Sequence, residues 1–383
     1  MRTAFVGATV FDGEALRPDV ALVVEDGRVV AVTPEAQASG VPVALDGGVI
    51  APGFVDLQVN GGGGVLLNGQ PDVAGIAAIC AAHARLGTTG LLPTLITDTP
   101  EVTRAVVEAG VAAAGRVPGF LGLHFEGPHL DPRRKGAHDP ALIRPIAAED
   151  LALLVGAARR LPSLLVTVAP EAVTPLQVAA LTAAGAVVSL GHSDTGFAGA
   201  AAMIAAGARA VTHLFNAMSQ LGSREPGLVG AALDAPEVAA GLIADGIHVA
   251  PAAIRAALAA KRGEDAIFLV TDAMAVAGTA LDGFELSGRR VLRRDGRLTL
   301  EDGTLAGADI DMAGAIRLLV REGVPLARAL RMATVAPAKL LGRDTLGRLR
   351  PGGPADFVWL DTNLALGGVW RGGGKIDPAG RSV

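Results

Sequence analysis

Short apolar runs alternate with alanine-rich stretches of helical spacing through the middle of the chain. Eight runs rich in β-forming residues begin near positions 54, 88, 120, 164, 186, 210, 239 and 266, and helical stretches separate them. Parallel strands need helical crossovers, and a closed barrel leaves no sheet edge to protect. The alternation therefore predicts an α/β fold with a (β/α)8 TIM-like barrel, with a doubly wound open sheet as the alternative architecture.

Both ends of the chain follow a different pattern. In about the first fifty residues, short apolar runs alternate with Asp-Gly pairs, which are typical of hairpin turns. The pattern returns near the C-terminus in LRPGGPADFVWLD, a segment too short to fold alone. We therefore expect a small β-sandwich domain built from residues 1–51 and 347–383, and a catalytic barrel domain of residues 52–346.

Polar side chains fall at the ends of the predicted barrel strands, where barrel enzymes place their chemistry. Glu126 closes the third strand, His192 the fifth and His213 the sixth. Two imidazoles and a carboxylate can hold zinc or a similar divalent ion and leave one position open for water. The alternative is that the three are ordinary polar groups at strand ends.

Asp272 ends the eighth predicted strand, in VTDAM. A carboxylate near an activated water could take its proton and later deliver it to a leaving amine. Asp272 is thus the candidate acid/base, with a cap on the following helix as the alternative. No lysine lies in a predicted barrel strand, which argues against a lysine-bridged pair of metal ions.

Composition narrows the class of protein. The 383 residues carry a net charge of -5 with scattered Lys and Arg, which disfavours a nucleic-acid partner. The single cysteine, Cys80, cannot form an internal disulfide, and the N-terminus lacks the features of a signal peptide. We expect a soluble cytoplasmic protein without a membrane partner.

The motifs resemble those of the N-acetylglucosamine-6-phosphate deacetylases of the amidohydrolase superfamily. Eight occur in order over most of the chain: PGFVDLQVNGGGG, HFEGPHLDPRRKGAH, GHSD, THLFNAM, REPGLVG, ADGIHV, VTDA and GTLAGADIDM. The resemblance implies hydrolysis of N-acetyl-D-glucosamine 6-phosphate to D-glucosamine 6-phosphate and acetate. It also implies one divalent ion, zinc first and iron or another ion next, at Glu126, His192 and His213, with Asp272 as the acid/base.

The resemblance further implies a substrate pocket for an amino-sugar phosphate. His138 and His248 would contact the sugar and the scissile amide, and His138 would also help to stabilise the oxyanion. Asn216, Ala217 and Arg224 would bind the phosphate, and because the family's arginine reaches across a subunit interface, a homodimer is implied. Leu305, Ala306 and Gly307 are similar to a substrate-covering loop, with a plain glycine turn as the alternative.

One departure from the pattern concerns the first strand. Many amidohydrolases carry His-x-His there, whereas this chain has Gln58-Val59-Asn60. Because side-chain amides are poor zinc ligands, we expect one metal ion rather than two. Two other functions remain open: an amidohydrolase for N-acylamino acids or cyclic amides, and a catalytically silent sugar-phosphate-binding protein.

Overall fold

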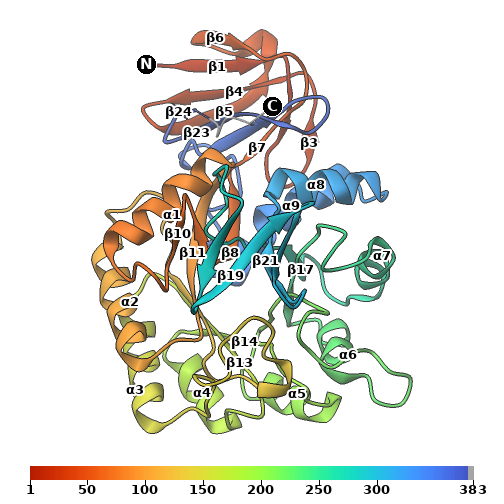
Figure 1. The fold of residues 1–383 in the computed structure, drawn as a ribbon. Helices are drawn as coiled ribbons and strands as arrows, with labels where there is room; N and C mark the ends of the chain where they lie inside the picture. The colour runs from red at the N-terminus through yellow and green to blue at the C-terminus, as the bar shows by residue number, and fades with distance from the viewer. Residues whose placement is uncertain (378–383) are drawn as a thin grey trace.

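Eight parallel strands form the centre of the computed structural model, which describes residues 1–377 (Figure 1). Neighbouring strands follow one another in sequence order, so each connection is a crossover between parallel neighbours. The strands are β8 (Phe54–Val59), β11 (Thr88–Ile96), β12 (Leu123–Glu126), β13 (Leu164–Val168), β14 (Val187–Leu190), β15 (Ala210–Val211), β16 (Ala239–Leu242) and β17 (Ile267–Leu269).

The segment after β17 closes this sheet against β8. Asp272 donates a main-chain hydrogen bond of 3.0 Å to Gln58, and Asn60 donates one of 2.8 Å to Ala273. The predicted (β/α)8 barrel is therefore confirmed, and each strand lies within a few residues of its predicted position. Closure brings the ends of the first and last strands side by side, which matters for the site described below.

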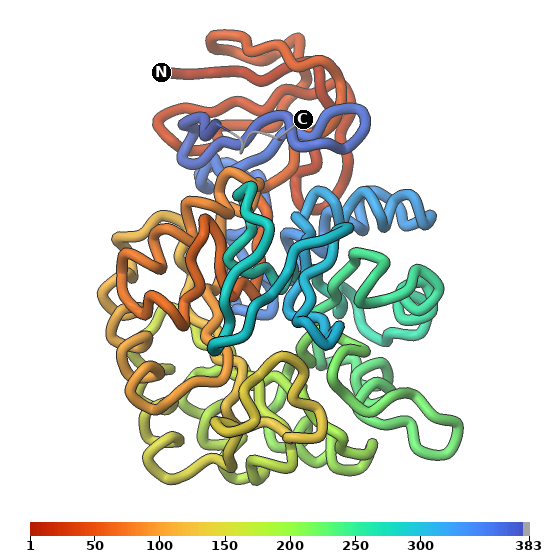
Figure 2. Tube along the Cα trace, in the orientation of Figure 1, coloured from red at the N-terminus to blue at the C-terminus, as the bar shows by residue number. Residues whose placement is uncertain are grey.

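Helices surround the barrel, as Figures 1 and 2 show. Several begin at the signals expected of helix starts, because Asp72, Thr99 and Thr174 accept hydrogen bonds from the first-turn amides. The helices are α1 (Val73–Arg85), α2 (Pro100–Ala113), α3 (Ala148–Arg160), α4 (Pro175–Ala183), α5 (Phe197–Ala205), α6 (Gly227–Asp234), α7 (Pro251–Ala260), α8 (Met312–Arg321), α9 (Leu326–Ala333) and α10 (Val335–Leu340), with 3-10 turns η1 (Glu35–Gln37) and η2 (Pro132–Arg134). Within residues 1–377, no helix combines the length and the apolar character that crossing a membrane would require.

Two sheets from the chain ends pack on each other above the barrel in Figure 1. One has the order β5-β4-β1-β6 and the other β24-β23-β22-β7-β2-β3. Their shared core includes Phe5, Phe357 and Trp370, the last two stacked with ring centroids 4.7 Å apart. The strands are β1 (Thr3–Val6), β2 (Thr9–Phe11), β3 (Leu16–Arg17), β4 (Val20–Glu25), β5 (Arg28–Pro34), β6 (Val41–Ala44), β7 (Val49–Pro52), β22 (Phe357–Leu360), β23 (Leu366–Arg371) and β24 (Gly374–Ile376).

Strands β7 and β22 join the two chain ends in antiparallel register, with Ile50 opposite Trp359. The predicted sandwich built from both termini is therefore confirmed as a fold class. The limits at residues 51 and 347 stay a prediction, and residues 378–383 of the predicted small domain lie outside the described part of the chain.

A further antiparallel sheet follows the barrel strands and lies across the barrel in Figures 1 and 2, in cyan. It consists of β18 (Gly283–Leu286), β19 (Arg289–Arg294), β20 (Arg297–Leu300) and β21 (Leu305–Ala308), and a small hairpin, β9 (Gly61–Gly62) and β10 (Val65–Leu66), follows β8. Leu305, Ala306 and Gly307 thus lie in a strand, not in the loop or glycine turn that the sequence predicted. The loop was expected from the resemblance, and only the glycine turn depended on Gly307, which keeps a φ of +70° within the strand.

Candidate metal centre and active site

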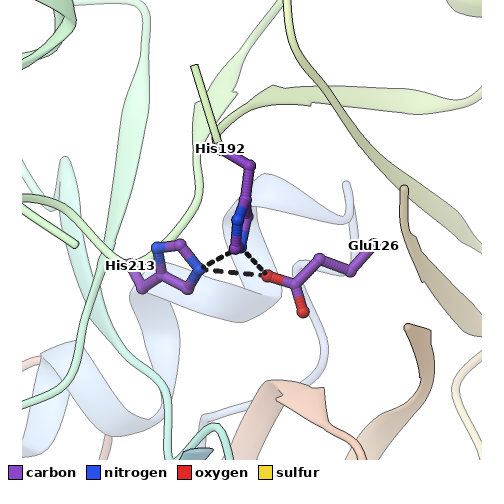
Figure 3. A group of neighbouring side chains, drawn as sticks. All are labelled: Glu126, His192 and His213. Carbon is purple, nitrogen blue, oxygen red and sulfur yellow. Dashed lines mark hydrogen bonds and ion pairs between the residues drawn. The ribbon is translucent and has the colours of Figure 1, made fainter. Parts of the chain in front are cut away.

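Glu126, His192 and His213 come together at one end of the barrel (Figure 3). Glu126 is the last residue of β12, while His192 and His213 follow β14 and β15 by two residues. Glu126 Oε1 lies 3.1 Å from His192 Nε2 and 3.0 Å from His213 Nε2, and the two nitrogens are 3.1 Å apart. All three side chains are buried.

The hydrogen bonding of this trio fits a divalent ion. His192 Nδ1 lies 2.8 Å from the Arg134 carbonyl oxygen, which can only accept, so Nδ1 carries the hydrogen. In a neutral ring, Nε2 then presents a lone pair to Glu126 Oε1, which is itself an acceptor. Acceptor atoms that converge in this way, with the outer nitrogen of a histidine held by a carbonyl, are typical of a metal site.

The surroundings of Glu126 favour its ionised form. Burial raises the pKa of Glu126, but hydrogen bonds and charge from His192 and His213 outweigh burial and hold this pKa well below its ordinary value. Glu126 is therefore ionised at neutral pH, as a metal ligand must be.

Asp272 faces the same site from the end of the last barrel strand. Its Oδ1 accepts hydrogen bonds from Gln58 Nε2 at 3.1 Å and from Asn60 Nδ2 at 2.7 Å. Burial raises the pKa of Asp272 to about 6, and the negative charge of Glu126 contributes to the rise. The side chain binds these amides and does not cap a helix, since Asp311 caps α8, the next helix along the chain.

Gln58 and Asn60 have a part in the site that the sequence analysis missed. Gln58 Nε2 donates to Glu126 Oε1 as well as to Asp272 Oδ1, both at 3.1 Å, and so links the trio to the candidate acid/base. Residues 58 and 60 share one face of β8 by the period of two. That periodicity, together with closure of the barrel, was the signal that could have revealed the contact.

The ends of these strands adopt unusual backbone conformations. His192, His213 and Asp272 have φ values of 48°, 29° and 50°, in the left-handed region that few non-glycine residues adopt. Conformations of this kind cluster at active sites, where the surrounding fold maintains them. The three residues occupy such positions together with Phe215 and Ala217, at 77° and 49°.

A cavity of about 500 Å³ opens next to the trio. Its walls contain most of the side chains proposed from the sequence: Glu126, His138, His192, His213, Asn216, Ala217, His248, Asp272, Leu305 and Gly307. Ala306 is fully buried, because alternate residues of β21 face opposite sides. Arg224 is exposed and does not line the cavity within this chain.

His138 reaches the cavity from the loop after β12. Its Nδ1 lies 2.8 Å from Thr97 Oγ1, and its ring packs edge-on against His192 with centroids 4.5 Å apart. Burial lowers the pKa of His138 to about 3, so the ring is neutral at physiological pH.

A chain of buried polar side chains runs beneath the trio. The Thr212 hydroxyl lies 2.6 Å from the Ser189 hydroxyl and 2.6 Å from the Thr167 hydroxyl. Thr167 Oγ1 in turn lies 2.7 Å from His124 Nε2. His124 Nδ1 is 3.2 Å from Thr94 Oγ1, which donates to a main-chain carbonyl. His124 Nδ1 is therefore the donor in that pair, and Nε2 accepts from Thr167.

The two remaining histidines lie outside the cavity wall. His83 is buried in α1, with Nε2 2.9 Å from the Gly61 carbonyl oxygen, and His129 Nδ1 lies 3.1 Å from the Arg144 carbonyl oxygen. Both rings thus contact main-chain carbonyl groups, His83 in the core and His129 in its loop.

Comparison with known proteins agrees with this geometry. The Amidohydrolase family model matches residues 49–378. An N-acetylgalactosamine-6-phosphate deacetylase of Shewanella sp. is 40% identical over 96% of this chain and 94% of its own length, and an N-acetylglucosamine-6-phosphate deacetylase of Haemophilus influenzae is 33% identical over 97% and 100%.

Solved structures of N-acetylglucosamine-6-phosphate deacetylases are also similar to this chain. The N-acetylglucosamine-6-phosphate deacetylase of Pasteurella multocida superposes with a TM-score of 0.93 at 34% identity, covering 98% of this chain and all of its own. A mutant of the Mycobacterium smegmatis N-acetyl-D-glucosamine-6-phosphate deacetylase, in complex with N-acetyl-D-glucosamine-6-phosphate, has a TM-score of 0.90 at 33% identity, with 98% of each chain covered. The chain therefore belongs to the amidohydrolase family, in the group of amino-sugar-6-phosphate deacetylases.

Proposed function

We propose that this protein removes the acetyl group from N-acetyl-D-glucosamine 6-phosphate by hydrolysis, giving D-glucosamine 6-phosphate and acetate. The observation that carries the proposal is the meeting of Glu126, His192 and His213 with Asp272 at one sugar-sized cavity. Relatives that share this fold over nearly their whole length carry the name of that activity.

We propose a single zinc ion at Glu126, His192 and His213. When bound, a divalent ion of this kind supplies a Lewis acid and a strongly activated water at neutral pH. The donor set of two imidazoles and one carboxylate supports this choice, although iron or another divalent ion would also suit it. Gln58 and Asn60 replace the two histidines that would bind a second ion.

Asp272 is the proposed acid/base. Gln58 and Asn60 anchor its Oδ1, which leaves Oδ2 to accept a proton from the attacking water. The water oxygen bonds to the acetyl carbon as the proton moves to Asp272. When the C–N bond breaks, the same proton passes to the sugar nitrogen, so that Asp272 returns to its starting state.

His138 would stabilise the oxyanion as a hydrogen-bond donor. A neutral imidazole donates one hydrogen without carrying charge, and burial keeps His138 in that form. A preorganised donor of this kind stabilises the developing negative charge in a site that excludes water.

Asn216 and Ala217 are the proposed phosphate-binding residues of the cavity wall, and Arg224 would complete the site from a second subunit. Arg133 and Arg134, the arginines that line the cavity within residues 1–377, are engaged by Asp131 and Asp194. A phosphate therefore needs further positive charge, and Arg224 of the partner subunit in a homodimer would provide it. Leu305, Gly307 and their strand β21 would cover the sugar.

N-acetyl-D-galactosamine 6-phosphate is the second candidate substrate. The 40% identity to the Shewanella sp. N-acetylgalactosamine-6-phosphate deacetylase favours it. The two sugars differ in the configuration of one hydroxyl group, which the positions named above do not distinguish.

The test is release of free amine by the purified protein. We expect turnover of one or both phosphorylated sugars, little with N-acetylglucosamine, and loss of activity with a chelator. Turnover of N-acylamino acids or cyclic amides instead would favour a different amidohydrolase, and tight binding without turnover would favour a silent binder. We further propose a cytoplasmic location and domain limits at residues 51 and 347.

A further inference from the structure

We propose that Asp194 is a positioning residue of the metal centre, which fixes the turn that holds His192 in its metal-binding orientation. Asp194 would act through Arg134 and would not touch the ion. This inference rests on the metal centre of the proposed function and extends it to side chains outside the trio.

The turn in question contains η2 and follows β12. His192 Nδ1 donates to the main-chain carbonyl oxygen of Arg134 at 2.8 Å, and the main-chain amide of Asp131 donates to the His192 carbonyl oxygen at 2.9 Å. The turn therefore contacts this metal ligand at both its ring and its backbone. His192 depends on such support, because its φ of 48° lies in the left-handed region.

The side chain of Arg134 anchors the same turn. Its Nε and Nη2 atoms donate to Asp194 Oδ1 at 2.9 and 2.6 Å. Since Asp194 follows His192 by two residues, these contacts form a closed ring that begins and ends beside the ligand. The Arg134 and Asp194 side chains are 36% and 32% exposed, so the ion pair adds little to overall stability. Its effect is on the local geometry.

The position of the Arg134 carbonyl determines how His192 presents itself to an ion. The carbonyl keeps the hydrogen on Nδ1 and leaves Nε2 to face Glu126, as Figure 3 shows. Outer hydrogen-bond partners of this kind orient metal-binding histidines, and their loss typically lowers metal affinity by roughly 10-fold to 100-fold. A shift of the turn would therefore weaken metal binding.

A second histidine in the chain has the same arrangement but does not belong to the trio. His129 Nδ1 lies 3.1 Å from the Arg144 carbonyl oxygen, and Arg144 Nη2 donates to Asp150 Oδ1 at 3.0 Å. Asp150 also accepts from the Ala147 amide at the start of α3, so its removal costs stability as well. Asp150→Ala is therefore the matched control for Asp194→Ala.

Zinc affinity, measured by competition with a chelator, tests the positioning role. We expect Asp194→Ala to raise Kd about tenfold, the low end of the range above, because the ion pair is partly exposed and the Arg134 carbonyl remains. Asp150→Ala should leave Kd unchanged. An unchanged Kd in Asp194→Ala, or an equal rise in both variants, would overturn the proposal.

Two further measurements distinguish positioning from general destabilisation. With cobalt(II) in place of zinc, Asp194→Ala should alter the visible absorption, which depends on the geometry of the ligands, and Asp150→Ala should not. In an Arg134→Ala background, Asp194→Ala should cause almost no further loss of zinc affinity. A cobalt spectrum identical to that of the wild type, or additive losses of affinity, would overturn the role.

Failure of the proposed function would give a different result. If the wild-type protein binds zinc but does not hydrolyse N-acetylglucosamine 6-phosphate, the proposed function fails, and the zinc Kd values still decide on Asp194. If it binds no ion, NMR of protein with isotope-labelled histidine can follow the hydrogen on His192 Nδ1. Loss of that signal in Asp194→Ala but not in Asp150→Ala would still support positioning, and its retention would refute it.

Discussion

The side-chain amide of Asn60 donates a hydrogen bond of 2.7 Å to Asp272 Oδ1, across the closure of the barrel. An amide thus lies next to the proposed acid/base, on the strand where many amidohydrolases carry a histidine. A donor of this kind stabilises the ionised carboxylate and fixes its orientation. The amides of this strand would therefore assist the proposed proton-transfer step, although they are poor ligands for a second ion.

Removal of the Asn60 donor should shift the pH profile of the enzyme. Asn60→Ala leaves the ionised form of Asp272 less stable, so the pKa of Asp272 rises and the acidic limb of kcat/KM moves to higher pH. We expect a shift of roughly one to two pH units, from the usual strength of a hydrogen bond to a charged group. Asn68→Ala is the control, since Asn68 donates to Ile96 and Asp98 instead; an equal shift there would refute the assignment.

Activity of the wild-type protein should decline in acid through titration of Asp272. Burial raises the pKa of this carboxyl to about 6, and only the ionised form can accept a proton from water. Activity is therefore present above this pKa and lost as pH falls through it. A bound cation lowers the pKa of Asp272, so the acidic limb of the metal-loaded protein should lie at or below about pH 6. A pH series of kcat/KM at fixed metal content measures this.

Asp272→Asn should separate metal binding from turnover. The asparagine oxygen can still accept from Gln58 and Asn60, so the geometry of the site should survive. Loss of general acid/base catalysis is expected to lower kcat by roughly 10²-fold to 10⁴-fold. Metal analysis and substrate binding by calorimetry should match wild type, and a variant with near-normal kcat would rule out the proposed role.

Removal of the metal should destabilise the protein as well as inactivate it. Without an ion, Glu126, His192 and His213 keep buried acceptor groups at distances of 3.0–3.1 Å. Saturation at one hundred times Kd stabilises a folded protein by about 2.7 kcal/mol, so the chelated protein should melt at lower temperature. We expect one ion per chain to restore both properties; a requirement for two would contradict the single-ion model.

Thr167→Val should weaken the polar chain beneath the metal centre. The Thr167 hydroxyl connects His124 Nε2 and Thr212 Oγ1, at 2.7 and 2.6 Å. Its loss leaves buried polar groups unpaired and should lower the free energy of unfolding by about 1–3 kcal/mol in urea titrations. Thr33→Val in β5, outside the barrel, is the matched control. Because Thr212 precedes His213, metal affinity should fall in the first variant alone.

Much of the site could be predicted because barrel strands place their ends together. The positions of Glu126, His192, His213 and Asp272 follow from strand order alone, and the structure brings these side chains to one cavity. The sheet of β18–β21 was missed, since its charged strands lack the apolar pattern of the barrel. The exposure of Arg224 could not be predicted either, because it depends on long-range packing that no local pattern encodes.

The left-handed backbone at His192, His213 and Asp272 has a consequence for how this sequence tolerates change. Glycine would relieve strain of order 1–3 kcal/mol at each of these positions while removing the ligand or the acid/base. Where no ion is bound, selection for thermal stability alone would therefore favour a more stable but inactive barrel. Libraries screened for folding in the presence of a chelator should accumulate glycine at these strand ends, and their melting temperatures under the same conditions should rise as their activity disappears.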